Sequence, residues 1–104
     1  MNQLDLKTRH AVITGGAAGI GLAIAQRMLA SGARLTLWDR DDAALKQAQA
    51  LLGKDVHTVR VNVADHADVA RAAAASELHA PVDILVNSAG ITGPNVPLAD
   101  YPVD

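Results

Sequence analysis

The sequence has no cysteine and no phenylalanine, and Trp38 and Tyr101 are its only aromatic residues. The lack of cysteine excludes a disulfide framework, a thiolate nucleophile and the cysteine spacing of a zinc finger. It also fits a cytoplasmic location, which we expect. Because aromatic side chains are so scarce, strands rich in Val, Ile and Leu have to supply most of the buried area. Alanine-rich helices can pack closely on such strands, so the composition indicates helices layered on a sheet.

Positive charge is sparse as well. The net charge is −2, and the nine Lys and Arg residues stand singly, without any run of three. No basic stripe is present that could neutralise a nucleic-acid backbone, so we expect no nucleic-acid partner. The apolar run that starts at Ala11 is too short and too rich in glycine for a membrane span or a secretion signal, and we expect no membrane partner. The histidines have neither an i,i+3 nor an i,i+4 spacing, so no metal site is expected.

Short β-branched runs alternate with helical stretches along the chain. Strands are expected at residues 10–14, 34–38, 56–61 and 83–86, and helices at 19–30, 42–52 and 66–78. Since every connection between two strands contains a helix, right-handed crossovers make the strands parallel and place helices on both faces. The predicted fold class is α/β, an incomplete doubly wound parallel sheet of the Rossmann type, with four strands and three helices. Residues 1–90 form this βαβαβαβ unit, and residues 91–104, which hold three prolines, are expected to be a loop or a disordered tail.

Two local patterns make more detailed predictions. Asp65 followed by Asp68 resembles a capping box, in which the side chain at each end of the first helical turn binds a backbone N–H at the other. The uninterrupted run Ile84-Leu85-Val86 predicts a fourth strand that is buried on both faces, as in the interior of a parallel sheet.

The segment TGGAAGIG, residues 14–21, lies between the first strand and the helix that follows it. A turn at this place brings backbone N–H groups and the positive end of the helix dipole towards one point, where a phosphate can bind. Gly15 allows a tight turn out of the strand, Gly19 lets the backbone approach a diphosphate, and Gly21 lets the helix pack closely. A turn that binds nothing is the alternative, but the flanking strand and helix favour a phosphate site.

Asp39 ends the second strand, 18 residues after Gly21. A carboxylate there can accept hydrogen bonds from both hydroxyls of an adenosine ribose. It also repels a 2′-phosphate, so NAD is favoured over NADP. Arg40 weakens this preference, because its guanidinium could stack on adenine or bind a phosphate. The alternative role of Asp39 is that of a carboxylate at the start of the next helix.

The spacing TGxxxGIG, joined to the sequence NSAG at residues 87–90, resembles the short-chain dehydrogenase/reductase family. Nearly the whole chain is similar to the N-terminal half of that family. The resemblance implies a nucleotide-binding fold and an NAD(P)-dependent oxidoreductase, with sugar and polyol dehydrogenases as the first candidates and 3-oxoacyl-carrier-protein reductases next. The positions that would hold the cofactor are Gly15, Ala18, Gly19 and Ile20 at the diphosphate, Asp39 at the adenosine ribose, Asn62 and Val63 at the adenine, and Asn87, Ala89 and Gly90 at the second ribose. Arg40 is added to them as a residue that stacks on adenine or binds a phosphate.

Two positions depart from the family pattern. Asn62 stands where the family usually has Asp, but its amide oxygen can still accept a hydrogen bond from the adenine amino group. Ser88 replaces the second Asn of the usual NNAG motif with a smaller hydroxyl that keeps some local hydrogen bonding. For Asn87 two roles stay open, a bond that ties the fourth strand to its neighbour and a contact with the cofactor.

Members of the family transfer hydride with a Ser, a Tyr and a Lys that stands four residues after the Tyr. Only three residues follow Tyr101 and none is Lys, so no catalytic residue is assigned. The chain is therefore expected to be inactive alone and to be the cofactor half of a longer enzyme that acts on a small alcohol or ketone. The family usually forms homo-oligomers, most often tetramers. Two other hypotheses remain, a non-catalytic NAD-binding module and a structural domain whose glycine turn binds nothing.

Overall fold

Strands and helices alternate along the chain in the computed structural model, which describes residues 8–88. The elements are β1 (His10–Thr14), α1 (Gly19–Ala30), β2 (Arg34–Asp39), α2 (Asp42–Leu52), β3 (His57–Arg60), α3 (His66–His79) and β4 (Ile84–Asn87). Every predicted element is present, and every end agrees with the prediction within one residue. The predicted tail at 91–104 lies outside the described residues.

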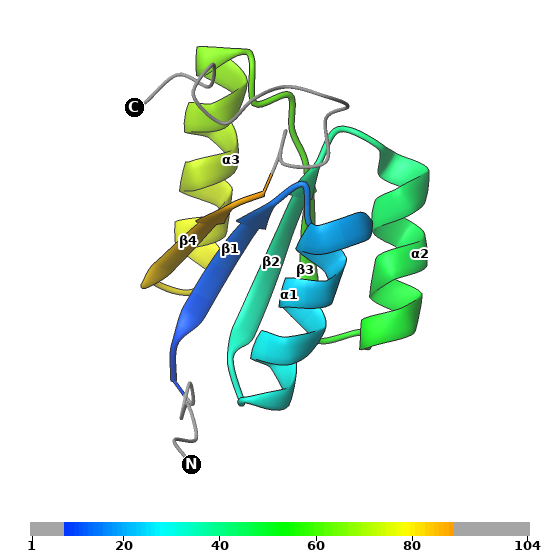
Figure 1. Ribbon diagram of the computed structural model, residues 1–104. Coiled ribbons are helices and arrows are strands. Elements are labelled where there is room, and N and C mark those ends of the chain that lie inside the picture. Colours follow the sequence, from blue (N-terminus) through cyan, green and yellow to red (C-terminus); the bar gives the residue numbers. More distant parts are fainter. Residues whose placement is uncertain (1–7, 89–104) are drawn as a thin grey trace, which may run out of the picture.

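The strands form one parallel sheet with the order β3-β2-β1-β4. Helices α1 and α2 lie on one face of the sheet and α3 lies on the other, as Figure 1 shows. The predicted α/β class, with parallel strands and helices on both faces, is therefore confirmed. Because parallel strands all run in one direction, their carboxyl ends meet at a single edge, which is the upper edge in Figure 1.

Alternate residues of the strands build two separate hydrophobic layers. The layer under α1 and α2 is centred on Ala11, Ile13, Leu35 and Leu37, which are almost fully buried. The layer under α3 is smaller and joins Val12, Trp38, Val59, Val61 and Ala72. This division follows from the strand geometry, in which successive side chains point to opposite faces.

Polar groups continue the layer under α3. The indole Nε1–H of Trp38 donates a hydrogen bond of 3.0 Å to the hydroxyl of Ser76, and that hydroxyl donates to the carbonyl of Ala72 at 2.8 Å. The imidazole Nε2 of His10 lies 2.6 Å from the hydroxyl of Thr36. These groups are buried, so the bonds compensate for the loss of their contacts with water.

The predicted burial of the fourth strand on both faces is wrong. Ile84 and Val86 pack on the layer under α1, but Leu85 points to the other face and is 64% exposed. A run of apolar residues cannot reveal this difference, because it depends on which strands α3 covers. The layer under α3 takes Val12, Trp38 and Val59 from β1, β2 and β3, and Leu85 of β4 lies outside it.

Among residues 8–88, no helix has the length and the apolar character that crossing a membrane requires.

The predicted capping box at the start of α3 is only half correct. The side chain of Asp65 accepts hydrogen bonds from the N–H groups of Ala67 and Asp68, as an N-cap should. The carboxylate of Asp68, however, accepts the N–H of Asn62 at 2.7 Å instead of returning to Asp65. The backbone that leaves β3 offers Asp68 a better placed donor than the helix start does.

Candidate functional site

Polar residues gather at the carboxyl edge of the sheet, among them the predicted ligand-binding residues Asp39, Asn62 and Asn87. Thr14, Asp39 and Asn87 are the last residues of β1, β2 and β4, which are neighbouring strands. Asn62 follows β3 after a gap of one residue. The turn from β1 to α1 lies over the same edge, so the site is assembled by the topology from four separate parts of the chain.

The backbone of the glycine-rich turn takes a conformation that other residues rarely adopt. Gly15 has φ 64° and Gly19 has φ 58°, both in the left-handed region. At Gly21 the reason for glycine is space, because an added Cβ would overlap the carbonyl oxygen of Gly15 and lie 2.5 Å from the hydroxyl oxygen of Ser88. The first turn of α1 is therefore packed directly against the turn that precedes it.

The start of α1 differs from the starts of the other two helices. Its N-cap residue, Ala18, has no side-chain acceptor, and its first turn holds no acidic residue. Helices α2 and α3 are both capped by an aspartate, Asp41 and Asp65. The N–H groups of the first turn of α1 and the positive end of its dipole are thus not neutralised by a side chain of the helix start, which suits the binding of an anion. Ile20 lies in this first turn and is 45% exposed.

The carboxylate of Asp39 connects the turn to the second strand. One oxygen accepts the N–H of Ala17 at 3.3 Å, and the other accepts the N–H of Asp41 at 3.1 Å. The N–H of Gly16 adds a bond of 3.2 Å to the carbonyl of Trp38. Asp39 is half-buried, and a carboxylate oxygen can accept more than one bond, so the group can still receive hydroxyls from a ligand.

Hydrogen bonds also join the end of β4 to the end of β1. The hydroxyl of Thr14 donates to the amide oxygen of Asn87 at 2.8 Å, and the hydroxyl of Ser88 donates to the carbonyl of Thr14. Asn87 therefore has the strand-tying role, while its contact with a cofactor stays a prediction. Ser88 is buried and keeps the local hydrogen bonding expected of it. Ala89 and Gly90 lie outside the described residues.

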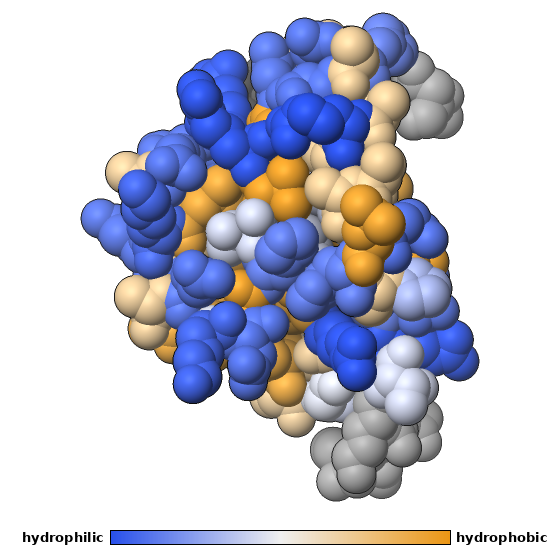
Figure 2. Space-filling model, turned by 180° about the vertical axis from the view of Figure 1, so that it is seen from behind, coloured by the Kyte–Doolittle hydropathy of each residue, from blue (hydrophilic) through white to orange (hydrophobic). Residues whose placement is uncertain are grey.

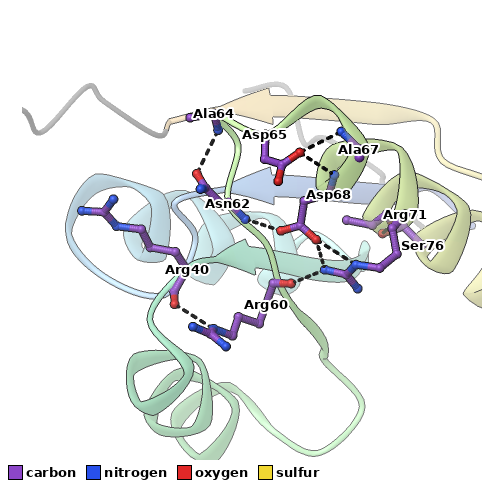
Figure 3. Close-up of polar contacts among 10 residues, drawn as sticks. Arg40, Arg60, Asn62, Ala64, Asp65, Ala67, Asp68, Arg71 and Ser76 are labelled. Atoms are coloured by element: carbon purple, nitrogen blue, oxygen red, sulfur yellow. Dashed lines mark hydrogen bonds and ion pairs between the residues drawn. The ribbon is translucent and has the colours of Figure 1, made fainter.

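Asn62, Val63 and Arg40 lie at the outer end of the site. The amide oxygen of Asn62 accepts the N–H of Ala64 at 3.0 Å, and Val63 is 48% exposed. The side chain of Arg60 donates to the carbonyl of Arg40 at 3.3 Å, and the guanidinium of Arg40 points away from this bond (Figure 3).

A cleft of about 580 Å³ runs along β3 and meets the site only at this outer end. Its lining comprises Arg40, Thr58, Val59, Arg60, Val61, Asn62, Asp68 and Arg71. The reverse side of the molecule shows separate hydrophobic patches with hydrophilic residues between and around them (Figure 2). No glycine of the turn lines this cleft, so the glycine-rich turn and the cleft are distinct features.

Several residues of the site have no clear signal in the sequence. The backbone N–H of Ala17 donates a hydrogen bond to the carboxylate of Asp39, and no pattern of side chains can indicate a backbone contact of this kind. Asp68, which the sequence indicated only as half of a capping box, accepts the backbone N–H of Asn62, and Arg71 donates to the carbonyl of Arg60. The signal that joins the two is the i,i+3 spacing of opposite charges on a helix. Within residues 8–88, no group of three or more His, Cys, Asp or Glu residues is placed to hold a metal ion.

Comparison with known proteins places these features in context. The family model described as short chain dehydrogenase matches residues 9–103. A 2-dehydro-3-deoxy-L-rhamnonate dehydrogenase (NAD(+)) of Sphingomonas sp. (strain SKA58) is 46% identical over 97 residues, which are 92% of this chain and 39% of that protein. A galactitol 2-dehydrogenase (L-tagatose-forming) of Cereibacter sphaeroides is 50% identical over 82 residues, which are 78% of this chain and 32% of that protein.

A solved structure supports the same relationship. The 3-ketoacyl-(acyl-carrier-protein) reductase of Brucella melitensis, complexed with NADH, superposes with a TM-score of 0.73 at 32% identity, over 77% of this chain and 33% of that one. The chain therefore spans less than two fifths of the length of each of these three relatives.

Proposed function

The chain belongs to the short-chain dehydrogenase family, and from this premise we propose that it binds NAD for a hydride transfer between an alcohol and a ketone. The observation that carries the proposal is the start of α1, where a glycine turn with two left-handed residues leads into a helix without a side-chain cap. A dinucleotide diphosphate is the anion that such a turn accommodates best, because it can lie along several backbone N–H groups at once.

The residues of the chain supply binding and orientation. The backbone from Gly15 to Ile20 holds the diphosphate, and Asp39 accepts the hydroxyls of the adenosine ribose. Asn62 and Val63 contact the adenine, and Asn87 is assigned to the second ribose together with Ala89 and Gly90, which lie outside the described residues. When bound, NAD accepts or returns the hydride, while the chain fixes where that exchange takes place. Residues 8–88 contain no tyrosine, so no acid or base for the reaction is assigned among them.

NAD is proposed over NADP on the charge of Asp39. A ribose 2′-phosphate at this place would meet the carboxylate of Asp39, and like charges a few ångströms apart repel. Arg40, the next residue, weakens this preference, because a guanidinium can bind a phosphate. The relatives agree with NAD, since one carries NAD(+) in its name and another was solved with NADH.

A sugar acid or a polyol is the proposed substrate class. Two relatives act on compounds of this kind according to their names, a rhamnonate derivative and galactitol. A 3-oxoacyl thioester is the second candidate, favoured by the likeness to the ketoacyl reductase. A homo-oligomer, a tetramer by resemblance, and a cytoplasmic location complete the proposal. A non-catalytic NAD-binding module is the alternative, which the lack of tyrosine in residues 8–88 would fit.

Titration calorimetry with NAD tests the binding step. The wild-type chain should bind NAD, and Gly19→Val should lose at least about tenfold in affinity, because a branched side chain strains a left-handed residue and fills the turn. Gly53→Ala is the matched control, since Gly53 also has a positive φ but lies at the far end of α2 with open space around it. A wild-type chain that releases no heat with millimolar NAD would refute the proposal. Because this chain is expected to be inactive alone, the substrate classes are separated on the longer enzyme, by assays of NADH formation with polyols and of NADH consumption with 3-oxoacyl thioesters.

A further inference from the structure

Asp68 and Arg71 of α3 bind the backbone at the end of the edge strand β3. Asp68 accepts the N–H of Asn62 at 2.7 Å, and Arg71 donates to the carbonyl of Arg60 at 2.7 Å. The two side chains are joined to each other by bonds of 2.8 Å from Nε and 2.7 Å from the terminal nitrogen of Arg71. Figure 3 shows both reaching from the helix to the same stretch of strand.

The backbone groups that they bind face away from the sheet. The N–H of Val61 donates to the carbonyl of Asp39 in β2 at 3.0 Å, so the groups of Arg60 and Asn62 on either side point outward. On an edge strand such groups are the ones that a further strand would pair with. Here Arg71 donates to the outward carbonyl of Arg60, and Asp68 accepts from the outward N–H of Asn62, so the two side chains take the place of a neighbouring strand.

These bonds hold the segment that carries the predicted adenine contacts. Besides the bond from Asp68, the amide oxygen of Asn62 accepts the N–H of Ala64, and its carbonyl accepts the N–H of Asp65 at 3.0 Å. The backbone N–H, the side chain and the carbonyl of Asn62 are thus all engaged. Only the bond to Asp68 comes from outside the short turn 62–65, so it ties the turn to the body of α3.

We propose that Asp68 and Arg71 are positioning residues for adenine recognition, acting by fixing Asn62 at the end of β3. The inference rests on the proposed function, because it takes Asn62 to accept the adenine amino group. An exposed ion pair contributes little to stability by itself. The side chain of Asp68, however, is only 26% exposed and makes its bond to a strand backbone.

The protonation state of Asp68 agrees with this role. The N–H of Asn62 and, to a smaller extent, the guanidinium of Arg71 lower the pKa of Asp68 below its ordinary value of 3.8. The carboxylate is therefore charged at neutral pH, and a charged acceptor makes the stronger bond to an amide.

A pair of dinucleotides makes the test selective. NAD carries the adenine amino group, whereas nicotinamide hypoxanthine dinucleotide has a carbonyl in its place and a proton on the neighbouring ring nitrogen. The ratio of their affinities therefore measures recognition of this edge of the base, and its change on mutation reports the contact at Asn62. The wild-type chain should prefer NAD, and Asp68→Ala should bring the ratio down about tenfold, which is the effect of one lost hydrogen bond. Asp68→Asn should recover most of the preference, because the amide oxygen can still accept the N–H of Asn62. A purely structural role would weaken both dinucleotides equally.

The control is Asp42→Ala on α2. Asp42 pairs with Lys46 at 3.4 Å within one helix, and the preference for NAD should not change. If Asp68→Ala does not fold, Arg71→Ala takes its place, with a loss of about threefold expected because the bond from Asp68 to Asn62 remains. An unchanged preference in the folded variants, or equal affinities of the wild type for both dinucleotides, overturns the positioning role. A wild type that binds neither dinucleotide refutes the proposed function instead.

Discussion

The carboxylate of Asp39 accepts the backbone N–H of Ala17 at 3.3 Å, although 22 residues separate them along the chain. Through this bond the group that is proposed to bind the ribose also supports the turn that is proposed to bind the diphosphate. The two parts of the candidate site are therefore coupled, and a change at Asp39 should affect both.

Replacement of Asp39 by alanine should lower the affinity for NAD about 10- to 100-fold and relax the discrimination against NADP. The ribose loses a charged acceptor, and the repulsion of a 2′-phosphate disappears. Asp39→Asn is the informative companion, because it keeps an acceptor for Ala17 without the charge. Calorimetric titration with both cofactors measures the two affinities, and an unchanged ratio in both variants would remove Asp39 from the ribose site.

The Gly21→Ala variant should be destabilised by about 1–3 kcal/mol and should bind NAD more weakly. The new methyl group would overlap the carbonyl of Gly15 and crowd the hydroxyl of Ser88, so the start of α1 has to move. Addition of Ser88→Gly removes only the second of these contacts and should restore only part of the stability. Thermal unfolding monitored by circular dichroism measures the change, and full recovery in the double variant would mean that the carbonyl of Gly15 adapts freely.

The Ser76→Ala variant should cost about 1–3 kcal/mol, because it leaves the buried indole N–H of Trp38 without its acceptor. Trp38 is the only tryptophan, so its fluorescence reports on this site directly. We expect a shifted emission maximum together with a lower urea midpoint. In a double-mutant cycle, the penalty of Ser76→Ala should shrink in a Trp38→Phe background, where no donor is left. A penalty of equal size in both backgrounds would assign the loss to packing alone.

Stability should fall as the pH drops below neutral because of His57. Burial and, to smaller extents, the neighbouring His79 and His10 lower the pKa of His57 below its ordinary value of 6.5. The ring of His57 stacks on that of His79 at a centroid distance of 4.5 Å. Between the folded and the unfolded pKa, the unfolded chain binds more protons. The contribution of the neutral His57 ring to the free energy of unfolding is therefore fully present above pH 6.5, and it is lost as the pH falls through the lowered pKa of the folded state.

Urea unfolding between pH 8 and pH 5 tests the role of His57. The variant His57→Gln should show a shallower loss of stability over this range, whereas His66→Gln, at the exposed start of α3, should keep the wild-type slope. Equal slopes for the wild type and His57→Gln would show that another group is responsible.

The elements of the fold were predictable because their signals are local. Helix α2 has an aspartate cap at Asp41 and stops at Gly53, and β1 is a β-branched run ended by glycine. The glycine turn was predictable for the same reason, since the spacing of its glycines matches the backbone that they have to form. The exposure of Leu85 was not predictable from the sequence. It depends on which strands α3 packs against, and a run of apolar residues does not encode that packing.

The order of strands and helices, the glycine turn and the acidic residue that ends β2 follow from the amino-acid sequence, because each depends on residues close together in the chain. The folded arrangement was needed to show that Asp68 binds Asn62 instead of Asp65, that Asp39 accepts the N–H of Ala17, and that Ser88 binds Thr14. The physical reason is that these partners meet through parallel strand register and helix packing. A side chain takes the best-placed partner that the fold brings within reach, and no local pattern of residues encodes that distance.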